Sequence, residues 1–189
     1  LPIPEPWNND VRQSWVSLLG AGRAAVPVLE ALDQAGIVSG LIPEWEAVRS
    51  LPQRNPIHEF TVDRHLVETA GHAGQRARDV NRPDLLLVGA FLHDIGKGYP
   101  GDHSVVGADM TRDIAGRMGF DAADVDTLEL LVRYHLLLPD IATRRDLDDP
   151  ATVATVVDLV PDVESLELLH ALTWADAEAT GPSVRSSWR

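Results

Sequence analysis

The chain of 189 residues contains no cysteine, so it forms neither disulfide bonds nor metal sites with thiolate ligands. Any metal ion must therefore be bound by imidazole and carboxylate groups, and the chain has 7 His and 29 Asp and Glu to supply them. Positive charge is scarce as well, because 16 Lys and Arg leave a formal net charge of −13. Such a charge argues against broad contact with a nucleic-acid backbone, and we expect no nucleic-acid partner.

Long hydrophobic runs are also missing. No uninterrupted apolar stretch approaches the roughly 18 residues that cross a bilayer, and the start of the chain, Leu1 to Pro6, lacks the basic and apolar regions of a signal peptide. We therefore expect no membrane association and a cytoplasmic location. The chain begins with Leu rather than Met, which favours a fragment of a longer protein.

Helical periodicity and capping signals recur along the chain, and no segment of useful length has the period of a strand. We expect helices at about 11–19, 24–35, 62–73, 84–94, 104–118, 122–137, 151–159 and 162–179, with a short helical turn at 43–46. Residues 96–102 are expected to form a loop because Gly and Pro dominate them, and 144–150 a polar connection. The predicted fold is all-α, with the almost entirely apolar segment 84–94 buried on all sides.

An imidazole and a carboxylate stand side by side at the end of this apolar segment, in His93 and Asp94. Further candidate ligands precede and follow the pair, each on a different predicted helix or at its end: His65, His103, His135 and Asp176. This is what a metal site inside a helical bundle requires. Asp94 can bridge two cations because a carboxylate has two oxygens.

Each candidate also has a simpler explanation. His103 could be a helix-start residue in a glycine loop, and His135 a helix-end residue that faces the last carbonyl groups. Lys97 offers a positive charge to a phosphate oxygen, but a solvated loop lysine is the alternative.

Several motifs outside these residues resemble the HD domain of bifunctional PII uridylyltransferase/uridylyl-removing enzymes, which belong to the HD superfamily of metal-dependent phosphohydrolases. The matching segments are NPIHEFTVDRH at 55–65, HDIGKG at 93–98, GDHSVVGA at 101–108, RRDL at 144–147 and LTWADAEATGP at 172–182, with IPEW at 42–45 leading into them. The resemblance covers about residues 37–189. It implies an N-terminal helical lead-in at 1–40 and an HD phosphohydrolase domain at 41–189.

The resemblance also implies a function and a set of roles. It implies a metal-dependent phosphodiesterase that removes UMP, or in some bacteria AMP, from a tyrosine of a PII nitrogen-signalling protein. The nucleotidyltransferase and ACT domains expected in the same enzyme are absent from this sequence. The family pattern places metal ligands at His65, His93, Asp94 and Asp176, and related two-metal HD proteins add His103 and His135, with Asp94 as the bridge.

The remaining predictions concern ions and substrate contacts. We expect Mn²⁺ or Mg²⁺, with Fe²⁺ and Zn²⁺ as alternatives, and the sequence leaves open whether one or two ions bind. Asp94 and Lys97 are the predicted catalytic residues. His58, Lys97, Arg144 and Arg145 are the predicted substrate-binding residues, although the two arginines could instead pair with neighbouring aspartates.

Two other functions are compatible with the metal residues. The chain could be an HD phosphohydrolase that acts on a small nucleotide or an alarmone, or a regulatory HD module that binds nucleotide or a partner without turnover. The long matches outside the metal residues favour removal of a nucleotidyl group from PII over hydrolysis of a small molecule. Because every ligand position is filled, the sequence also argues against a degenerate regulatory module.

Overall fold

The computed structural model describes residues 3–53 and 59–181, and within these residues it is helical without any strand. The longer helices are α1 (Asn9–Gly20), α2 (Ala25–Gln34), α4 (Val62–Arg76), α5 (Pro83–Leu92), α6 (His103–Arg117), α7 (Ala122–Arg133), α8 (Leu137–Arg144), α9 (Pro150–Leu159) and α10 (Val163–Thr180). A short helix α3 (Ile37–Leu41) and three 3-10 turns complete the set: η1 (Gly22–Ala24), η2 (Pro43–Ala47) and η3 (Ile95–Gly98). The predicted all-α fold is confirmed.

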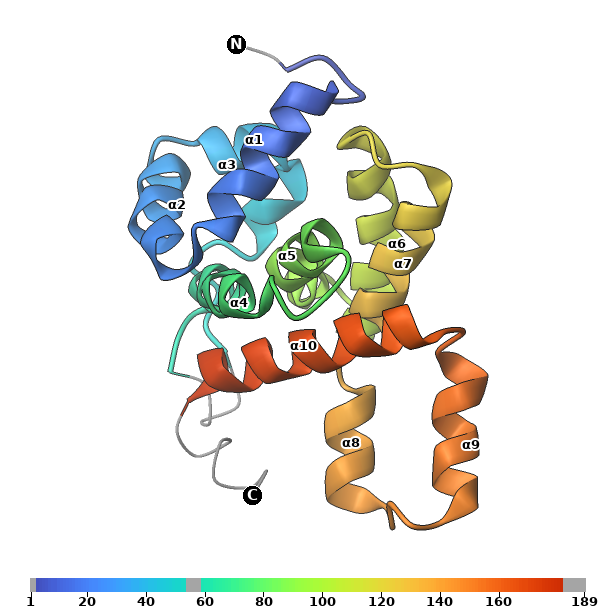
Figure 1. Cartoon of the computed structure of the whole chain (residues 1–189). Helices are drawn as coiled ribbons and strands as arrows, with labels where there is room; N and C mark the ends of the chain where they lie inside the picture. The colour runs from blue at the N-terminus through green and yellow to red at the C-terminus, as the bar shows by residue number, and fades with distance from the viewer. Residues whose placement is uncertain (1–2, 54–58, 182–189) are drawn as a thin grey trace.

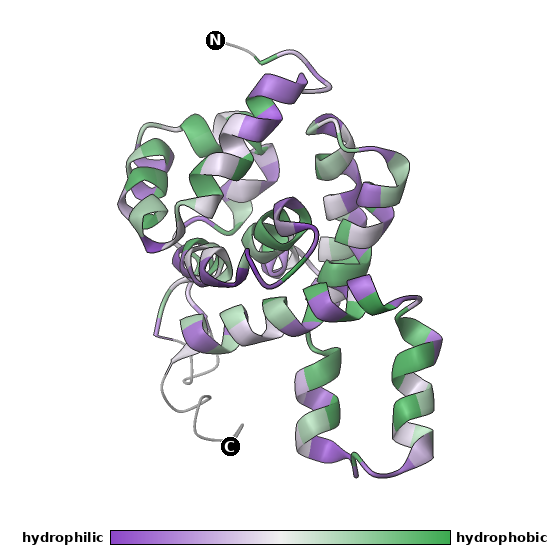
Figure 2. Ribbon diagram, viewed as in Figure 1, coloured by the Kyte–Doolittle hydropathy of each residue, from purple (hydrophilic) through white to green (hydrophobic). Residues whose placement is uncertain are grey.

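Helix α5 is the centre of the molecule (Figure 1). Every residue from 85 to 92 is buried, as the lack of polar positions predicts, and Figure 2 shows the helix as an apolar segment surrounded by amphipathic ones. Helices α1, α4, α7 and α10 contact it. The His–Asp pair that follows α5 in sequence is therefore carried into the core.

The N-terminal helices pack on the same core as the rest of the chain. The Trp45 ring stacks on Phe91 at the end of α5, with ring centroids 4.7 Å apart, and Trp15 of α1 meets the same ring edge-on at 5.3 Å. These aromatic contacts attach α1 and η2 to α5. The proposed division of the chain at residues 40 and 41 stays a prediction.

Helices α8 and α9 both project away from this core, below α10 (Figure 1). Here the predicted helix ends were wrong. The helix expected to run to Leu137 ends at Arg133, and α8 begins at Leu137. Pro139 does not terminate a helix but lies in the first turn of α8, where its missing N–H removes no intrahelical bond.

Two more boundaries differ from the prediction. The helix expected to reach Asp94 ends at Leu92, because the backbone of Asp94 departs from helical geometry at φ −108° and ψ 12°. Residues 95–98 form the turn η3 rather than open loop, and only 99–102 are irregular. The break between α5 and η3 turns the Asp94 side chain toward the neighbouring helices.

No single helix among the described residues is both long and apolar enough to cross a membrane. The segments Asn9–Gly20 and Gly22–Gln34 meet the length and composition test only as a pair, and they are bent by 105° where they join.

Candidate metal centre

Six side chains converge beside the C-terminal end of α5, from five parts of the fold. His65 lies in the first turns of α4, His93 directly follows α5, and Asp94 precedes η3. His103 begins α6, His135 follows α7, and Asp176 lies on α10. All six residues that the sequence predicts as metal ligands are thus brought together.

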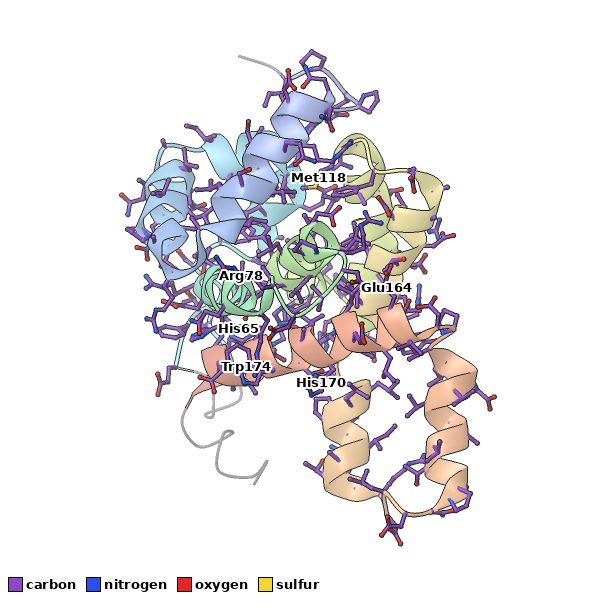
Figure 3. All side chains as sticks on the ribbon, viewed as in Figure 1. His65, Arg78, Met118, Glu164, His170 and Trp174 are labelled. Carbon is purple, nitrogen blue, oxygen red and sulfur yellow. The ribbon has the colours of Figure 1, made fainter. Side chains whose placement is uncertain are left out.

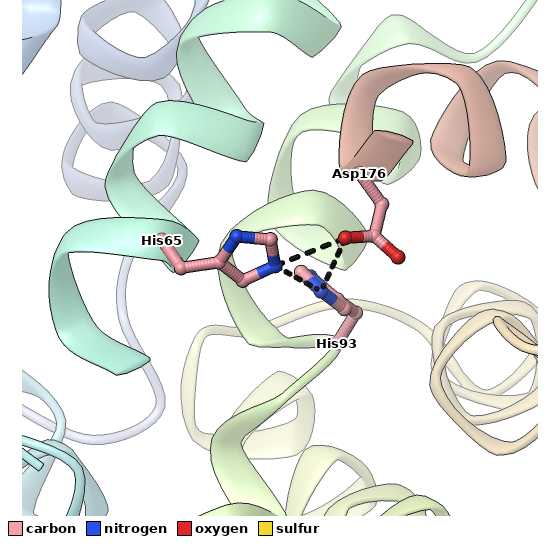
Figure 4. A group of neighbouring side chains, drawn as sticks. All are labelled: His65, His93 and Asp176. Atoms are coloured by element: carbon pink, nitrogen blue, oxygen red, sulfur yellow. Dashed lines mark hydrogen bonds and ion pairs between the residues drawn. The ribbon is translucent and has the colours of Figure 1, made fainter. Parts of the chain in front are cut away.

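These residues form two groups of three, and within each group the candidate ligand atoms all lie within 4.8 Å of one another. The first group is His65, His93 and Asp176 (Figure 4). The Nε2 atom of His65 lies 3.0 Å from Oδ1 of Asp176 and 3.3 Å from Nε2 of His93. The second group is Asp94, His103 and His135. Either group offers the nitrogen and oxygen donors that a divalent transition metal prefers.

The carboxylate of Asp94 lies between the two groups. Its Oδ2 atom faces the first group, 3.5 Å from Nε2 of His93 and 3.7 Å from Nε2 of His65. Its Oδ1 atom faces the second, 3.6 Å from Nε2 of His103 and 3.5 Å from Nε2 of His135. The two oxygens of one side chain are therefore directed at two sets of imidazoles, as bridging of two cations requires.

The chemistry of the donor set fits a metal ion. Oδ1 of Asp94 is buried without a hydrogen-bond partner in the part of the chain that the structure describes. Buried polar atoms are nearly always paired, so an orphaned carboxylate oxygen that faces two imidazole nitrogens indicates a missing partner. A divalent cation would supply it.

Two of the imidazoles are oriented by backbone carbonyls. Nδ1 of His93 lies 2.9 Å from the carbonyl oxygen of Ala90, and Nδ1 of His135 lies 2.7 Å from that of Val132. A carbonyl can only accept, so the proton of each neutral ring sits on Nδ1 and the lone pair of Nε2 points into the centre. This arrangement is typical of metal-binding histidines.

The pKa values of Asp94 and Asp176 are both lowered, because neighbouring imidazole and ammonium groups outweigh the opposite effect of burial. Burial alone would raise the pKa of Asp94, but His93, His135 and Lys97 hold it well below its usual range. For Asp176, burial is likewise outweighed by the hydrogen bond from His65 and the charge of His93, and its pKa is lowered. Both carboxylates are ionised across the physiological range.

The imidazoles respond in opposite directions. Burial would lower the pKa of His93, but the carboxylates of Asp94 and Asp176 raise it above 6.5. The pKa of His103 is lowered, mainly because burial disfavours its charged form. Positive charge is thus favoured on His93 and disfavoured on His103.

Lys97 is the other predicted site residue at the centre. Its Nζ atom lies 2.5 Å from Oδ2 of Asp94 and donates a hydrogen bond to Oε1 of Gln53 at 2.8 Å. The sequence alone did not single out Gln53, because an amide in a loop of no particular pattern carries no signal. Lys97 is partly exposed, with 23% of its side chain accessible, so its ammonium can meet a ligand from solvent.

The other predicted substrate-binding residues are not placed at the centre. Arg144 is the last residue of α8 and pairs with Asp140 one turn earlier, at 3.5 Å, rather than with the aspartates that follow it. Arg145 is exposed just beyond it, at the end of α8 away from the bundle (Figure 1). His58 lies outside the described residues.

Two histidines that belong to neither group have other surroundings. His72 is buried farther along α4 and meets the ring of Trp174 edge-on at a centroid distance of 6.2 Å. His170 is exposed on α10, the helix that also carries Trp174 (Figure 3).

Comparison with known proteins identifies the family to which the chain belongs. Three similar proteins are all named bifunctional uridylyltransferase/uridylyl-removing enzyme. The one from Streptomyces coelicolor is 60% identical over 100% of this chain, the one from Mycobacterium tuberculosis 51% over 99%, and the one from Corynebacterium glutamicum 38% over 97%. The chain covers only 22%, 23% and 27% of these enzymes, respectively. Residues 62–178, which include all six converging side chains, match the HD domain family, and the chain belongs to that family.

Proposed function

We propose that the chain is a metal-dependent phosphodiesterase that removes a nucleotidyl group, UMP or AMP, from a tyrosine of a PII nitrogen-signalling protein. The observation that carries the chemistry is the carboxylate of Asp94, whose two oxygens face two groups of candidate ligands. The name of the relatives, which includes uridylyl removal, supports the choice of substrate.

In this proposal the two groups would hold two divalent cations. His65, His93 and Asp176 would bind one and His103 and His135 the other, with the Asp94 carboxylate available to both. Mn²⁺ or Mg²⁺ suits these ligands best, with Fe²⁺ and Zn²⁺ as alternatives. Such ions, when bound, lower the pKa of water and neutralise charge on phosphoryl oxygens.

The side chains around the ions complete the site. Asp94 keeps both groups at a fixed separation, because its backbone is held between α5 and η3. Lys97 supplies an ammonium at the accessible side of the centre, where it can donate to a non-bridging phosphate oxygen as negative charge develops. His58, Arg144 and Arg145 stay predicted substrate contacts, of which the two arginines would act on a protein substrate from the end of α8.

The reaction exchanges one phosphorus–oxygen bond for another. The bond from phosphorus to the tyrosine oxygen breaks, a water oxygen takes its place, and the products are a nucleoside monophosphate and PII with an unmodified tyrosine side chain. A phenol has a pKa of about 10, so the phenolate leaves without a strong general acid. Because the leaving group needs little protonation, the cations matter more to this reaction than a dedicated proton donor does.

We also propose that the chain works as part of a longer enzyme. It spans 22–27% of the length of the curated relatives named above. Their name includes a uridylyltransferase activity, which we assign to a nucleotidyltransferase domain outside this chain, with ACT domains as ligand sensors.

The test compares protein-bound with free nucleotides. The Mn²⁺-loaded chain is incubated with uridylylated PII, and in parallel with free nucleotides and an alarmone, and released UMP or phosphate is measured. We expect UMP from the protein substrate alone, and loss of this activity in a His93→Ala, Asp94→Ala double variant. His170→Ala, which changes an exposed histidine on α10, is the control and should keep full activity.

Two outcomes would contradict the proposal. Hydrolysis of free nucleotides without release from PII would indicate a small-molecule phosphohydrolase. A chain that binds no metal and is as inactive as its double variant would indicate a regulatory module.

A further inference from the structure

The ammonium of Lys97 is held by two oxygen atoms from distant parts of the sequence. One is Oδ2 of Asp94 at 2.5 Å, and the other is Oε1 of Gln53 at 2.8 Å. Oδ2 of Asp94 is also the oxygen that faces His65 and His93. When a cation occupies the first group, as proposed above, it competes with Lys97 for this oxygen. Gln53 is then the remaining acceptor for Lys97 within residues 3–53 and 59–181.

The amide of Gln53 is oriented by this contact. An ammonium group can only donate, so the carbonyl oxygen of the amide must face Lys97. The other end of the amide, Nε2, is buried and has no hydrogen-bond partner among the described residues. A buried donor without a partner lowers stability, and an apolar side chain of similar length would avoid that loss. The hydrogen bond to Lys97 is therefore the reason for an amide, rather than an apolar side chain, at this position.

The loop that carries Gln53 is anchored to the helix that carries His65. Ser50 adopts a left-handed backbone conformation with φ 54°, and its N–H donates to Oδ2 of Asp63 at 2.7 Å. The N–H of Val62 donates to the carbonyl of Leu51 at 2.9 Å. A non-glycine residue stays in this conformation only when its surroundings enforce it. These bonds fix the loop against the start of α4, close to the first group of ligands.

We propose that Gln53 is a positioning residue, which holds the ammonium of Lys97 at the edge of the centre so that it contacts a phosphate oxygen when cations occupy the Asp94 carboxylate. The inference rests on the metal centre of the proposed function but not on the identity of the substrate.

The test measures binding of inorganic phosphate to the Mn²⁺-loaded chain by calorimetry. Gln53→Leu should weaken phosphate binding by about tenfold, the effect of losing one hydrogen bond to a charged group. The same variant should bind Mn²⁺ as tightly as the unaltered chain, and its Tm should be equal or higher because no buried amide is left unpaired. Gln13→Leu, the same change at an exposed position of α1, is the control and should alter none of these quantities.

A double variant distinguishes positioning from a separate structural role. If Gln53 acts through Lys97, then Gln53→Leu combined with Lys97→Met should bind phosphate no more weakly than Lys97→Met alone. Gln53→Met, which keeps an unbranched side chain, repeats the measurement in case leucine does not fit and the protein fails to fold.

Several results would overturn the inference. They are an unchanged phosphate affinity in both Gln53 variants, additive losses in the double variant, or a fall in Tm that accompanies the weaker binding. A chain that binds Mn²⁺ but not phosphate would overturn it as well. Failure to hydrolyse uridylylated PII would count against the proposed function and leave these binding results intact.

Discussion

The carboxylate of Asp94 takes part in most of the charge interactions of the centre. Removing a carboxylate from water costs several kcal/mol, and only close, well-oriented partners offset that cost. Here His93, His135 and Lys97 together hold its pKa well below its usual range. Such a buried cluster of charges contributes little to stability compared with apolar packing, so its presence is better explained by ion binding.

The raised pKa of His93 makes metal binding depend on pH. Without metal, the stabilisation that protonated His93 contributes is full below about pH 6.5, its ordinary pKa, and is lost as the pH rises through the raised value. A metal ligand must be neutral, so an ion has to displace this proton. We therefore expect the affinity for Mn²⁺ to rise between about pH 6 and pH 8, by up to about tenfold per pH unit.

Titration calorimetry in two buffers with different ionisation enthalpies measures both the affinity and the protons released. Asp94 and Asp176 should contribute nothing in this range because both are already ionised, and His103 contributes little because its pKa is lowered. An affinity that is flat or falls between pH 6 and pH 8 would contradict the assignment of His93 as a ligand.

The candidate metal ligands could be predicted from the sequence, but the contacts of the side chains around them could not. The order of His65, His93, Asp94 and Asp176 matches a known pattern, and His65, the His93–Asp94 pair and Asp176 belong to different predicted helices or their ends. The contact between Gln53 and Lys97 could not be predicted, because it joins a loop to a turn 44 positions away in sequence. The pair of Asp140 and Arg144, one helical turn apart, was missed because no helix was predicted over 138–144.

Among the secondary-structure elements, η3 and α6 are packed closely enough to fix the distance between the two ligand groups. A Cβ atom added to Gly96 would lie 2.1 Å from the carbonyl oxygen of His103 and 2.6 Å from the backbone nitrogen of Gly107. Both neighbours are backbone atoms and cannot rotate away. The glycine therefore lets the turn after Asp94 approach the start of α6, where His103 lies.

Replacing this glycine should damage both stability and metal binding. We expect Gly96→Ala to lower the free energy of unfolding by about 3 kcal/mol, the upper part of the usual range for overpacking. It should also weaken Mn²⁺ binding, because η3 must move away from His103. Chemical denaturation and calorimetry measure the two effects.

Gly116 provides a matched control on α6. A Cβ atom there would meet nothing within 4 Å, and the position is exposed and helical. Gly116→Ala should therefore stabilise the chain by about 0.5–1 kcal/mol without changing metal binding. Equal effects of the two substitutions would show that the contact between η3 and α6 does not matter.

Most helices could be predicted from the sequence, several of them to within one residue at both ends, and the larger errors are confined to a few ends. The apolar segment that becomes α5 and the capped segments that become α6 and α10 have strong periodic or capping signals. The errors occur where one signal has two meanings. Pro139 can follow one helix or begin the next, and only packing decides that α7 ends at Arg133. The five-residue helix α3 is too short to have a recognisable period.

For the whole molecule, the fold brings together side chains that are more than 100 residues apart in sequence. His65 of α4 and Asp176 of α10 meet at 3.0 Å because both helices pack along α5. The candidate ligand groups are therefore fixed by tertiary packing. An ion in the first group would link α4, α10 and the end of α5, and one in the second would link the start of α6 to the end of α7. Helices α8 and α9 extend beyond this core, on the side where we propose that a protein substrate is recognised (Figure 1).

The central claim is that Asp94 joins two ions within one centre. Anomalous diffraction from a crystal soaked in Mn²⁺ tests it directly. We expect two peaks about 3.5–4 Å apart, one among His65, His93 and Asp176 and the other beside His103 and His135, with the Asp94 carboxylate between them. A single peak that leaves Oδ1 of Asp94 without a ligand, or no peak among these residues, would contradict the account.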